Sequence, residues 1–315
     1  MGLFFANANL PVPAIPTIGV GLHWYYQSVS AVSLYSDHPS GSIFVPCFKS
    51  TGEAVIVEVK SAQLPMSCDL STSGAGGLDT GSVAASKFYC IRMIAKADGG
   101  DPVLLATLNA GTPTIPTAYQ GGLKSEILWG VSCSTDISPP YDTFDDIQSF
   151  IQTAPGVCQY QTGYASNPGY GISILTDGDA TASTAVDFSH CAPSPVAGSG
   201  RESIGEATLF VHADNISSNT KSCLILYSAD GRDDTDGEES MTVMHRLGPL
   251  DNLSAQGPRE ESELITFPLA LSATTTDYGF SSNSTGTLAN CLQYSWSGGA
   301  SCKLDLYVQG WSIRG

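Results

Sequence analysis

The sequence CKLDLYVQGWSI, residues 302–313, carries the strongest fold signal in the chain. Apolar side chains occupy every second position in its first part: Cys302, Leu304, Leu306 and Val308. Such a period-2 pattern predicts a β-strand with one buried face. The pattern slips by one residue at Gly310, after which Trp311 and Ile313 continue the apolar set. Because a glycine at a slip of register is typical of a β-bulge, we predict a bulge at Gly310.

Other segments show the same β character. Alternate residues of 207–214 form one apolar face: Ala207, Leu209, Val211 and Ala213. Residues 223–227 are wholly apolar, as in a strand covered on both faces. Residues 88–95 and 103–108 flank the turn Asp98-Gly99-Gly100-Asp101 and predict a β-hairpin. Helical crossovers and short repeats are not visible, which argues against a parallel α/β sheet and a β-helix.

One segment has helical spacing. In residues 143–153, Phe144, Ile147 and Ile151 fall at i, i+3 and i+7, Asp142 or Thr143 could cap the helix, and Pro155 ends it. We therefore predict a short helical connector between two β regions.

The predicted organisation is all-β, with two β-sandwich or jelly-roll-like regions. Residues 1–20, with prolines at positions 11, 13 and 16, predict an extended N-terminal arm. A β-rich module over 21–140, the connector over 141–160 and a C-terminal β-sandwich over 161–315 follow it.

The composition narrows the class of protein. Charged residues make up 14% of the chain, and the net charge is −17 with 13 basic residues, which argues against nucleic-acid binding. No apolar run approaches the roughly 18 residues of a transmembrane segment, so no membrane insertion is expected. The first residues lack a basic segment, so no signal peptide is expected.

Nine cysteines are spread along the chain without a CxxC pair. This spacing disfavours zinc and redox motifs and predicts buried thiols. If a disulfide forms, Cys291 and Cys302 are the favoured pair.

Catalytic motifs of the G-x-S-x-G, HExxH and P-loop types are absent from the sequence, and the five histidines lack ligand spacing. His212 falls on the polar face of its strand, facing solvent or an interface. We expect no enzyme activity and no cofactor. In the acidic segment 230–239, Asp234 and Asp236 fit an EF-hand loop, but Arg232 and Val243 occupy ligand positions. A solvated loop is the expectation, and a looser calcium site at Asp234 and Asp236 stays open.

Aromatic residues are the candidates for binding. His23-Trp24-Tyr25-Tyr26 places four rings in a row, and in a strand alternate rings face opposite sides. The candidate binding residues are Trp24, Tyr26, Tyr160, Tyr164 and Tyr170. Exposed tyrosines suit sugar stacking or protein recognition, whereas packing in the core or between subunits is the alternative.

Two parts of the sequence resemble proteins of tailed bacteriophages. Residues 76–131 are similar to a module of tail-fibre and other virion-appendage proteins. The matching pieces are Gly77–Gly81, Phe88-Tyr89, 104–108, Pro113–Pro116 with Tyr119, and 127–131. Upstream of the module, Gly21–Trp24 fits the entry strand. Residues 185–315 resemble the β-sandwich that follows in such proteins, from Ala185–Pro193 to the closing Gly310-Trp311 and Arg314-Gly315.

This resemblance implies a structural virion protein of the tail or baseplate, a tail-fibre or receptor-binding-like subunit that mediates host attachment. Without a shaft or anchor domain, a compact subunit is favoured. The implied partners are copies of itself, with a homotrimer favoured, other virion tail or capsid proteins, and a host surface glycan or pilus. A capsid decoration, cement or head-fibre protein and a carbohydrate-binding or depolymerising tailspike remain alternatives.

Overall fold

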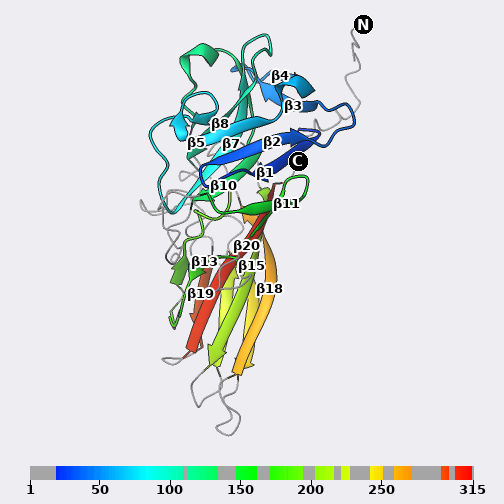
Figure 1. Ribbon diagram of the computed structural model, residues 1–315. Helices are drawn as coiled ribbons and strands as arrows, with labels where there is room; N and C mark the ends of the chain where they lie inside the picture. Colours follow the sequence, from blue (N-terminus) through cyan, green and yellow to red (C-terminus); the bar gives the residue numbers. More distant parts are fainter. Residues whose placement is uncertain are drawn as a thin grey trace, which may run out of the picture.

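The computed structural model describes residues 19–108, 112–133, 147–161, 171–182, 184–193, 203–215, 221–227, 242–250, 259–270, 292–297 and 302–313. Strands make up 60% of the structure, and these residues contain no helix of seven residues or more. The all-β prediction is therefore confirmed. Within the described parts, no helix is long and apolar enough to span a membrane. The molecule is elongated, with the early strands at one end and long late strands extending from them (Figure 1).

The N-terminal region, residues 19–133, consists of short strands: β1 (Leu22–Tyr26), β2 (Ala31–Ser36), β3 (Ile43–Phe48), β4 (Ala54–Val59), β5 (Met66–Ser73), β6 (Gly77–Leu78), β7 (Lys87–Ala95), β8 (Val103–Leu108), β9 (Leu123–Ser125) and β10 (Trp129–Cys133). Two 3₁₀ turns, η1 (Ser61–Gln63) and η2 (Thr117–Tyr119), lie between them. Strands β7 and β8 pair antiparallel around Asp98–Asp101, so the predicted hairpin is confirmed. The sheet is mixed, because β6 pairs in parallel with both β5 and β8.

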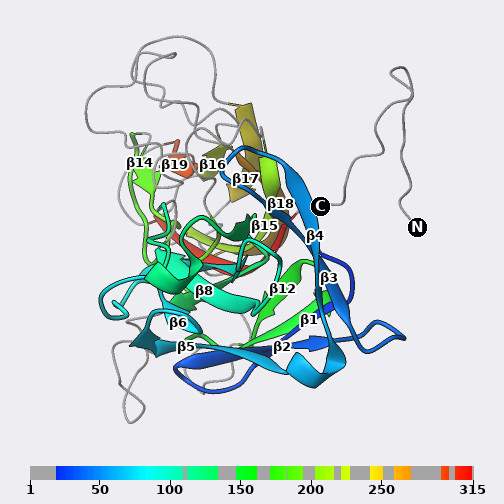
Figure 2. The same ribbon diagram turned by 90° about the horizontal axis from the view of Figure 1, so that it is seen from above.

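The C-terminal region, residues 171–313, contains the longest strands. Its elements are β13 (Ile172–Leu175), β14 (Thr184–Val186), β15 (Ser203–Asn215), β16 (Lys221–Tyr227), β17 (Thr242–Leu250), β18 (Arg259–Ala270), β19 (Leu292–Trp296) and β20 (Cys302–Ile313). Strand β15 pairs with β18 on one side and β20 on the other. A separate sheet has the order β14-β19-β16-β17. Seen along the long axis, β14, β19, β16 and β17 lie to one side of β15 and β18 (Figure 2).

The last strand behaves as its sequence predicts. Thr208 pairs with Gly310 and Leu209 with Val308, so Gln309 is the extra residue of a β-bulge. Trp311, which follows the bulge, is buried. The extra residue of the bulge thus places Trp311 on the same face of the strand as Leu304, Leu306 and Val308. The partner strand also follows prediction, because its alternating apolar residues are fully buried: Ala207, Leu209, Val211 and Ala213.

The predicted helical connector is wrong where the structure describes it. Ile147 forms an isolated bridge with Cys133, and a hairpin of two strands follows, β11 (Phe150–Ala154) and β12 (Val157–Tyr160). Residues 143–146 lie outside the described residues. We call β11 and β12 the bridging hairpin. A helix would bury Ile151, but Ile151 is 42% exposed while Phe150 is buried, as in a strand.

Strand pairing explains this outcome. β11 pairs with β1, where Ile151 lies opposite Tyr25, and β12 pairs with β20, where Cys158 lies opposite Trp311. Both outer edges of the hairpin thus receive backbone partners from distant segments, which outweigh a weak local helix preference. As a result, one sheet continues from β18, β15 and β20 through the bridging hairpin to β1 and β2.

An aromatic cluster fills the core where the two regions meet. Trp311 contacts Trp129 at a centroid distance of 4.8 Å and Phe88 at 5.8 Å, and Trp129 stacks on Trp24 at 5.9 Å. The bridging hairpin adds Phe150, 5.4 Å from Trp129. These contacts join strands from both regions, so a single buried core runs through the molecule.

The cysteines follow the buried-thiol prediction. Buried thiols occur in the N-terminal region, the bridging hairpin and the C-terminal region: Cys47, Cys68, Cys158, Cys191 and Cys223. Burial raises the pKa of the Cys47, Cys68 and Cys223 thiols to about 12, and that of Cys158 and Cys191 well above its ordinary value. Cys302 is buried, and Cys291, its suggested partner, lies outside the described residues.

Candidate functional site

Strand β1 divides its ring side chains between two faces. Trp24 is buried with 2% exposure, whereas Tyr25 is 50% exposed and His23 is half-buried. Successive side chains of a strand point to opposite faces, so the sequence LHWYY must send Trp24 inward and its neighbours outward. Of the four rings, Tyr25 is exposed, His23 and Tyr26 are half-buried and Trp24 is buried.

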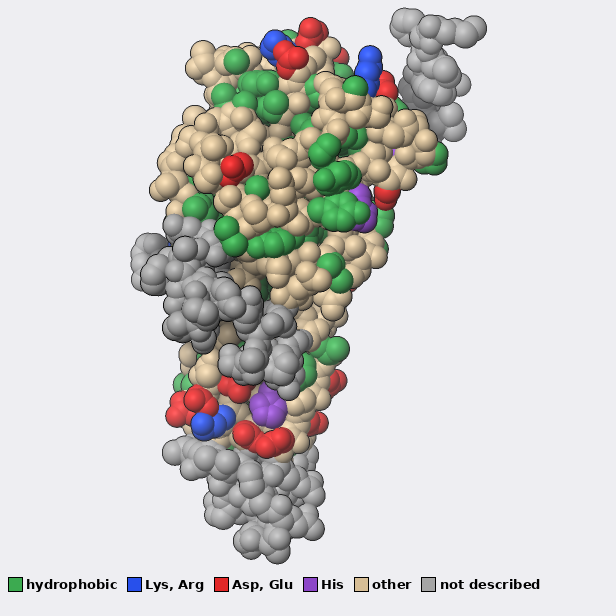
Figure 3. All heavy atoms as spheres, viewed as in Figure 1, with side chains coloured by type: hydrophobic (Ala, Val, Ile, Leu, Met, Phe, Trp, Pro, Cys, Tyr) green, Lys and Arg blue, Asp and Glu red, His purple; other side chains and the backbone are tan. Residues whose placement is uncertain are grey.

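Neighbouring strands extend the exposed rings into a surface. His23 lies opposite Tyr35 of β2, and Tyr25 lies opposite Ile151 of β11. The rings of Tyr25 and Tyr35 meet edge to face at 5.0 Å, and those of His23 and Tyr25 lie 4.5 Å apart. We call these four residues the aromatic surface. Tyr35 and Ile151 are 41% and 42% exposed, and hydrophobic side chains gather beside a histidine over this part of the molecule (Figure 3).

A polar row continues the aromatic surface across the sheet. Tyr25 lies opposite Ser33, and Ser33 lies opposite Ser67 of β5. The two serine Oγ atoms are 3.2 Å apart, and Ser67 Oγ donates to Gln27 Oε1 at 3.1 Å. Ser33 is buried with 3% exposure, and its hydroxyl bonds Gln27 and Ser67. The polar groups that remain accessible beside the rings are the Ser67 hydroxyl and the Gln27 amide, which can bind sugar hydroxyls.

The sequence-based candidates occupy different places. Trp24 lies in the core, and Tyr26 is half-buried with its ring edge toward Phe150 at 6.4 Å. Tyr160 is buried: its hydroxyl accepts from Trp311 Nε1 at 3.1 Å and donates to the Cys191 carbonyl at 2.6 Å. The loss of solvation in this site raises the pKa of the Tyr160 phenol well above its usual range. Tyr164 and Tyr170 lie outside the described residues, as do Asp234 and Asp236.

Trp24 and Tyr26, the two candidates in β1, thus lie on the face of the strand that packs on the core. Tyr25, Tyr35 and Ile151 form the exposed aromatic surface together with His23, and none of these three was singled out as a binding residue. The segment 31–36, AVSLYS, carries only a weak signal, since Ala31, Val32, Ser33 and Leu34 are all buried and Tyr35 is its first exposed residue. Ile151 carries no such signal, because the spacing of apolar residues in its segment predicts a helix.

One further group of side chains has metal-ligand spacing. His212, Asp214 and Glu260 bring one ligand atom each to within 4.8 Å of one another. His212 was expected on a polar strand face, and it is half-buried there. Its neighbours in space, Asp214 and Glu260, come from β15 and β18 and are 46 positions apart in sequence.

No family model matches the sequence, and neither the curated proteins nor the solved structures contain a match.

Proposed function

We propose that this protein is a non-catalytic structural subunit of a tailed bacteriophage's tail or baseplate, and that its aromatic surface binds the host. The aromatic surface is the observation that carries the host-binding part. Tyr25 and Tyr35 are exposed rings on the outer face of a sheet whose opposite face is core, and the half-buried His23 lies beside them. The virion assignment is supported by the resemblance of residues 76–131 and 185–315 to appendage proteins.

For the C-terminal region we propose a β-sandwich. Its two sheets contribute inward side chains to the same buried core, including Val211 and Leu304 from one and Ile225 and Leu292 from the other. Polar contacts also join the sheets: His245 of β17 pairs with Glu263 of β18 at 2.6 Å, and the Gly248 N–H donates to Glu261 Oε2 at 2.8 Å. These contacts fit two sheets packed face to face.

Host recognition by this surface would use several weak contacts. A tyrosine face stacks on the apolar face of a sugar, while Ser67 and Gln27 are placed to bond sugar hydroxyls. Each site would bind weakly, and a homotrimer displayed in several copies would raise the effective affinity by avidity. Burial of apolar strand faces between subunits would supply the assembly energy. A surface glycan is thus the ligand class that we propose, and the site of action is the assembled virion.

The test is binding of the purified full chain to an array of bacterial surface polysaccharides. We expect Tyr25→Ala and Tyr35→Ala each to lower binding to the recognised polysaccharide about fivefold, because stacking contributes about 1 kcal/mol per ring. Ile56→Ala is the matched control, since Ile56 is an exposed apolar residue of β4 outside the aromatic surface, 55% exposed. Equal binding by all variants would contradict the role of the aromatic surface.

Two further measurements address the alternatives. Polysaccharide chain length should stay unchanged after incubation, whereas shortening would indicate a depolymerase. Labelling of intact particles with an antibody should locate the protein at the tail in a few to some tens of copies. Hundreds of copies on the head would instead indicate a capsid decoration protein.

A further inference from the structure

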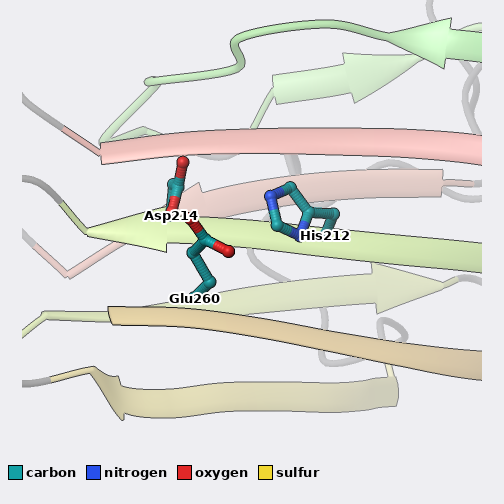
Figure 4. A group of neighbouring side chains, drawn as sticks. All are labelled: His212, Asp214 and Glu260. Carbon is teal, nitrogen blue, oxygen red and sulfur yellow. The ribbon is translucent and has the colours of Figure 1, made fainter. Parts of the chain in front are cut away.

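We propose that His212, Asp214 and Glu260 form a binding site for a divalent transition-metal ion, with zinc the preferred ion. His212 and Asp214 stand two residues apart on β15, so they share one face of the strand. Glu260 lies opposite Asp214 on β18. Figure 4 shows the three side chains on the same face, with the carboxylates and the imidazole turned toward one another.

The imidazole is held in an orientation that suits a ligand. His212 Nδ1 lies 2.8 Å from Ser262 Oγ, and Ser262 is the residue opposite His212 on β18. This contact occupies Nδ1 and leaves Nε2 to face the carboxylates (Figure 4). Metal-binding histidines usually engage their second ring nitrogen in this way, which fixes the ring and directs the other nitrogen at the metal.

The Asp214 carboxylate is incompletely partnered. Asp214 Oδ1 is buried and has no hydrogen-bond partner among the described residues. Lys303, the residue opposite Asp214 on β20, directs its Nζ to Asp177 Oδ1 at 2.6 Å instead. A bound dication would neutralise both carboxylates and give Asp214 Oδ1 a partner.

The donor set favours a particular class of ion. One imidazole nitrogen with two carboxylate oxygens suits zinc and neighbouring transition ions, whereas calcium and magnesium prefer six or more oxygen ligands. Small rotations of the exposed Glu260 side chain would bring the donors to metal distances of roughly 2.0–2.2 Å. Three protein ligands leave a fourth position for water. A bound ion would link β18, the edge strand of the sheet, to β15.

The experiment is calorimetric titration of the purified full chain with ZnCl₂, followed by the visible spectrum of the protein loaded with Co²⁺. We expect one zinc ion per chain and a cobalt spectrum without a thiolate charge-transfer band. His212→Gln and Glu260→Gln should abolish this saturable site, and Ser262→Ala should weaken it about tenfold by releasing the ring. Folding of each variant is checked by circular dichroism.

His38→Gln is the matched control. His38 Nδ1 also lies beside a serine hydroxyl, Ser40 Oγ at 2.7 Å, but in the described residues His38 belongs to no group with metal-ligand spacing. This variant should bind zinc like the unaltered protein. Zinc binding that survives in His212→Gln and Glu260→Gln, or that is absent from the unaltered protein, would overturn the proposal. A thiolate band in the cobalt spectrum would do the same, since it would assign the metal to a cysteine.

Discussion

Strands β15, β18 and β20 of the C-terminal region run for 13, 12 and 12 residues, whereas β1 to β10 of the N-terminal region run for two to nine. A long strand repeats its apolar alternation often enough to be recognised from sequence, and it pairs antiparallel with its neighbours over its whole length. The short strands pair over a few residues each, and two of their pairings are parallel. The strands of the C-terminal region are thus easier to recognise from the sequence than most of those in the N-terminal region.

The bridging hairpin joins these two regions into one continuous sheet. Its two strands pair with β1 on one side and with β20 on the other, and the aromatic cluster packs between the same two regions. We therefore expect the two regions to unfold together, although their strands are built differently. The predictions below test this coupling.

Alkaline pH should have the largest effect, because it acts on both regions at once. Cys47 and Cys68 in the N-terminal region and Cys223 in the C-terminal region have an ordinary pKa of 9.0 that burial raises to about 12. Below pH 9 the thiols are protonated in both states and stability does not change. From pH 9 to about pH 12 only the unfolded thiols lose their protons, so each thiol lowers the free energy of unfolding by about 1.4 kcal/mol per pH unit.

Urea denaturation at pH 8, 9, 10 and 11 measures this slope. The matched variant is Cys223→Ala. Its free energy of unfolding should fall less steeply with pH above 9, by the contribution of one thiol. A free energy of unfolding that is independent of pH above 9 would contradict the burial of these thiols.

Trp311→Ala should have the next largest effect. The change removes a buried ring that contacts Trp129 and Phe88, and truncations of this kind cost about 3–5 kcal/mol. Because the ring joins the two regions, we also expect the single unfolding transition to separate into two. Chemical denaturation followed by tryptophan fluorescence and by circular dichroism gives both readouts.

Trp296→Ala is the control for Trp311→Ala. Trp296 is buried in the second sheet, where its Nε1 donates to the Gly178 carbonyl at 3.0 Å. We expect this variant to be destabilised without separation of the transitions. Coincident transitions in Trp311→Ala would show that the junction does not couple the regions.

Gly310→Ala should destabilise the protein by about 1–3 kcal/mol, as overpacking does in well-packed sites. A Cβ at residue 310 would lie 2.2 Å from the Cys158 carbonyl oxygen, in the strand of the bridging hairpin that pairs with β20. Gln309→Ala changes the neighbouring bulge residue without adding an atom near β12 and should destabilise the protein less than Gly310→Ala does. The difference in thermal midpoint between the two variants measures the effect, and equal midpoints would argue against close contact at the bulge.

Tyr160→Phe should have the smallest effect, about 1–2 kcal/mol. The substitution keeps the ring but leaves Trp311 Nε1 and the Cys191 carbonyl without their buried partner. Tyr35→Phe, at an exposed tyrosine of the aromatic surface, is the control and should leave stability unchanged. If both variants have the same free energy of unfolding, the Tyr160 hydroxyl does not contribute to the junction.

The two regions also differ in how well their candidate sites could be predicted. For the aromatic surface, the row of rings at 23–26 draws attention to β1, and strand alternation predicts that Trp24 and Tyr25 face opposite sides. The partners of Tyr25 could not be predicted, because Tyr35 and Ile151 reach it only through strand pairing. For the proposed metal site, His212 was placed on the polar face, but Glu260 becomes its neighbour only through the register of β15 and β18.

The sequence by itself determined the all-β class, the hairpin of β7 and β8, the faces of β15 and the bulge at Gly310. Each of these follows from periodicity or turn chemistry within about a dozen residues. The conformation of residues 147–160 was determined by the tertiary structure alone, because the segment has helical spacing of apolar residues in its first part but forms a hairpin. Local preferences there are weak, and hydrogen bonds with β1 and β20, more than 100 residues away on either side, determine the conformation.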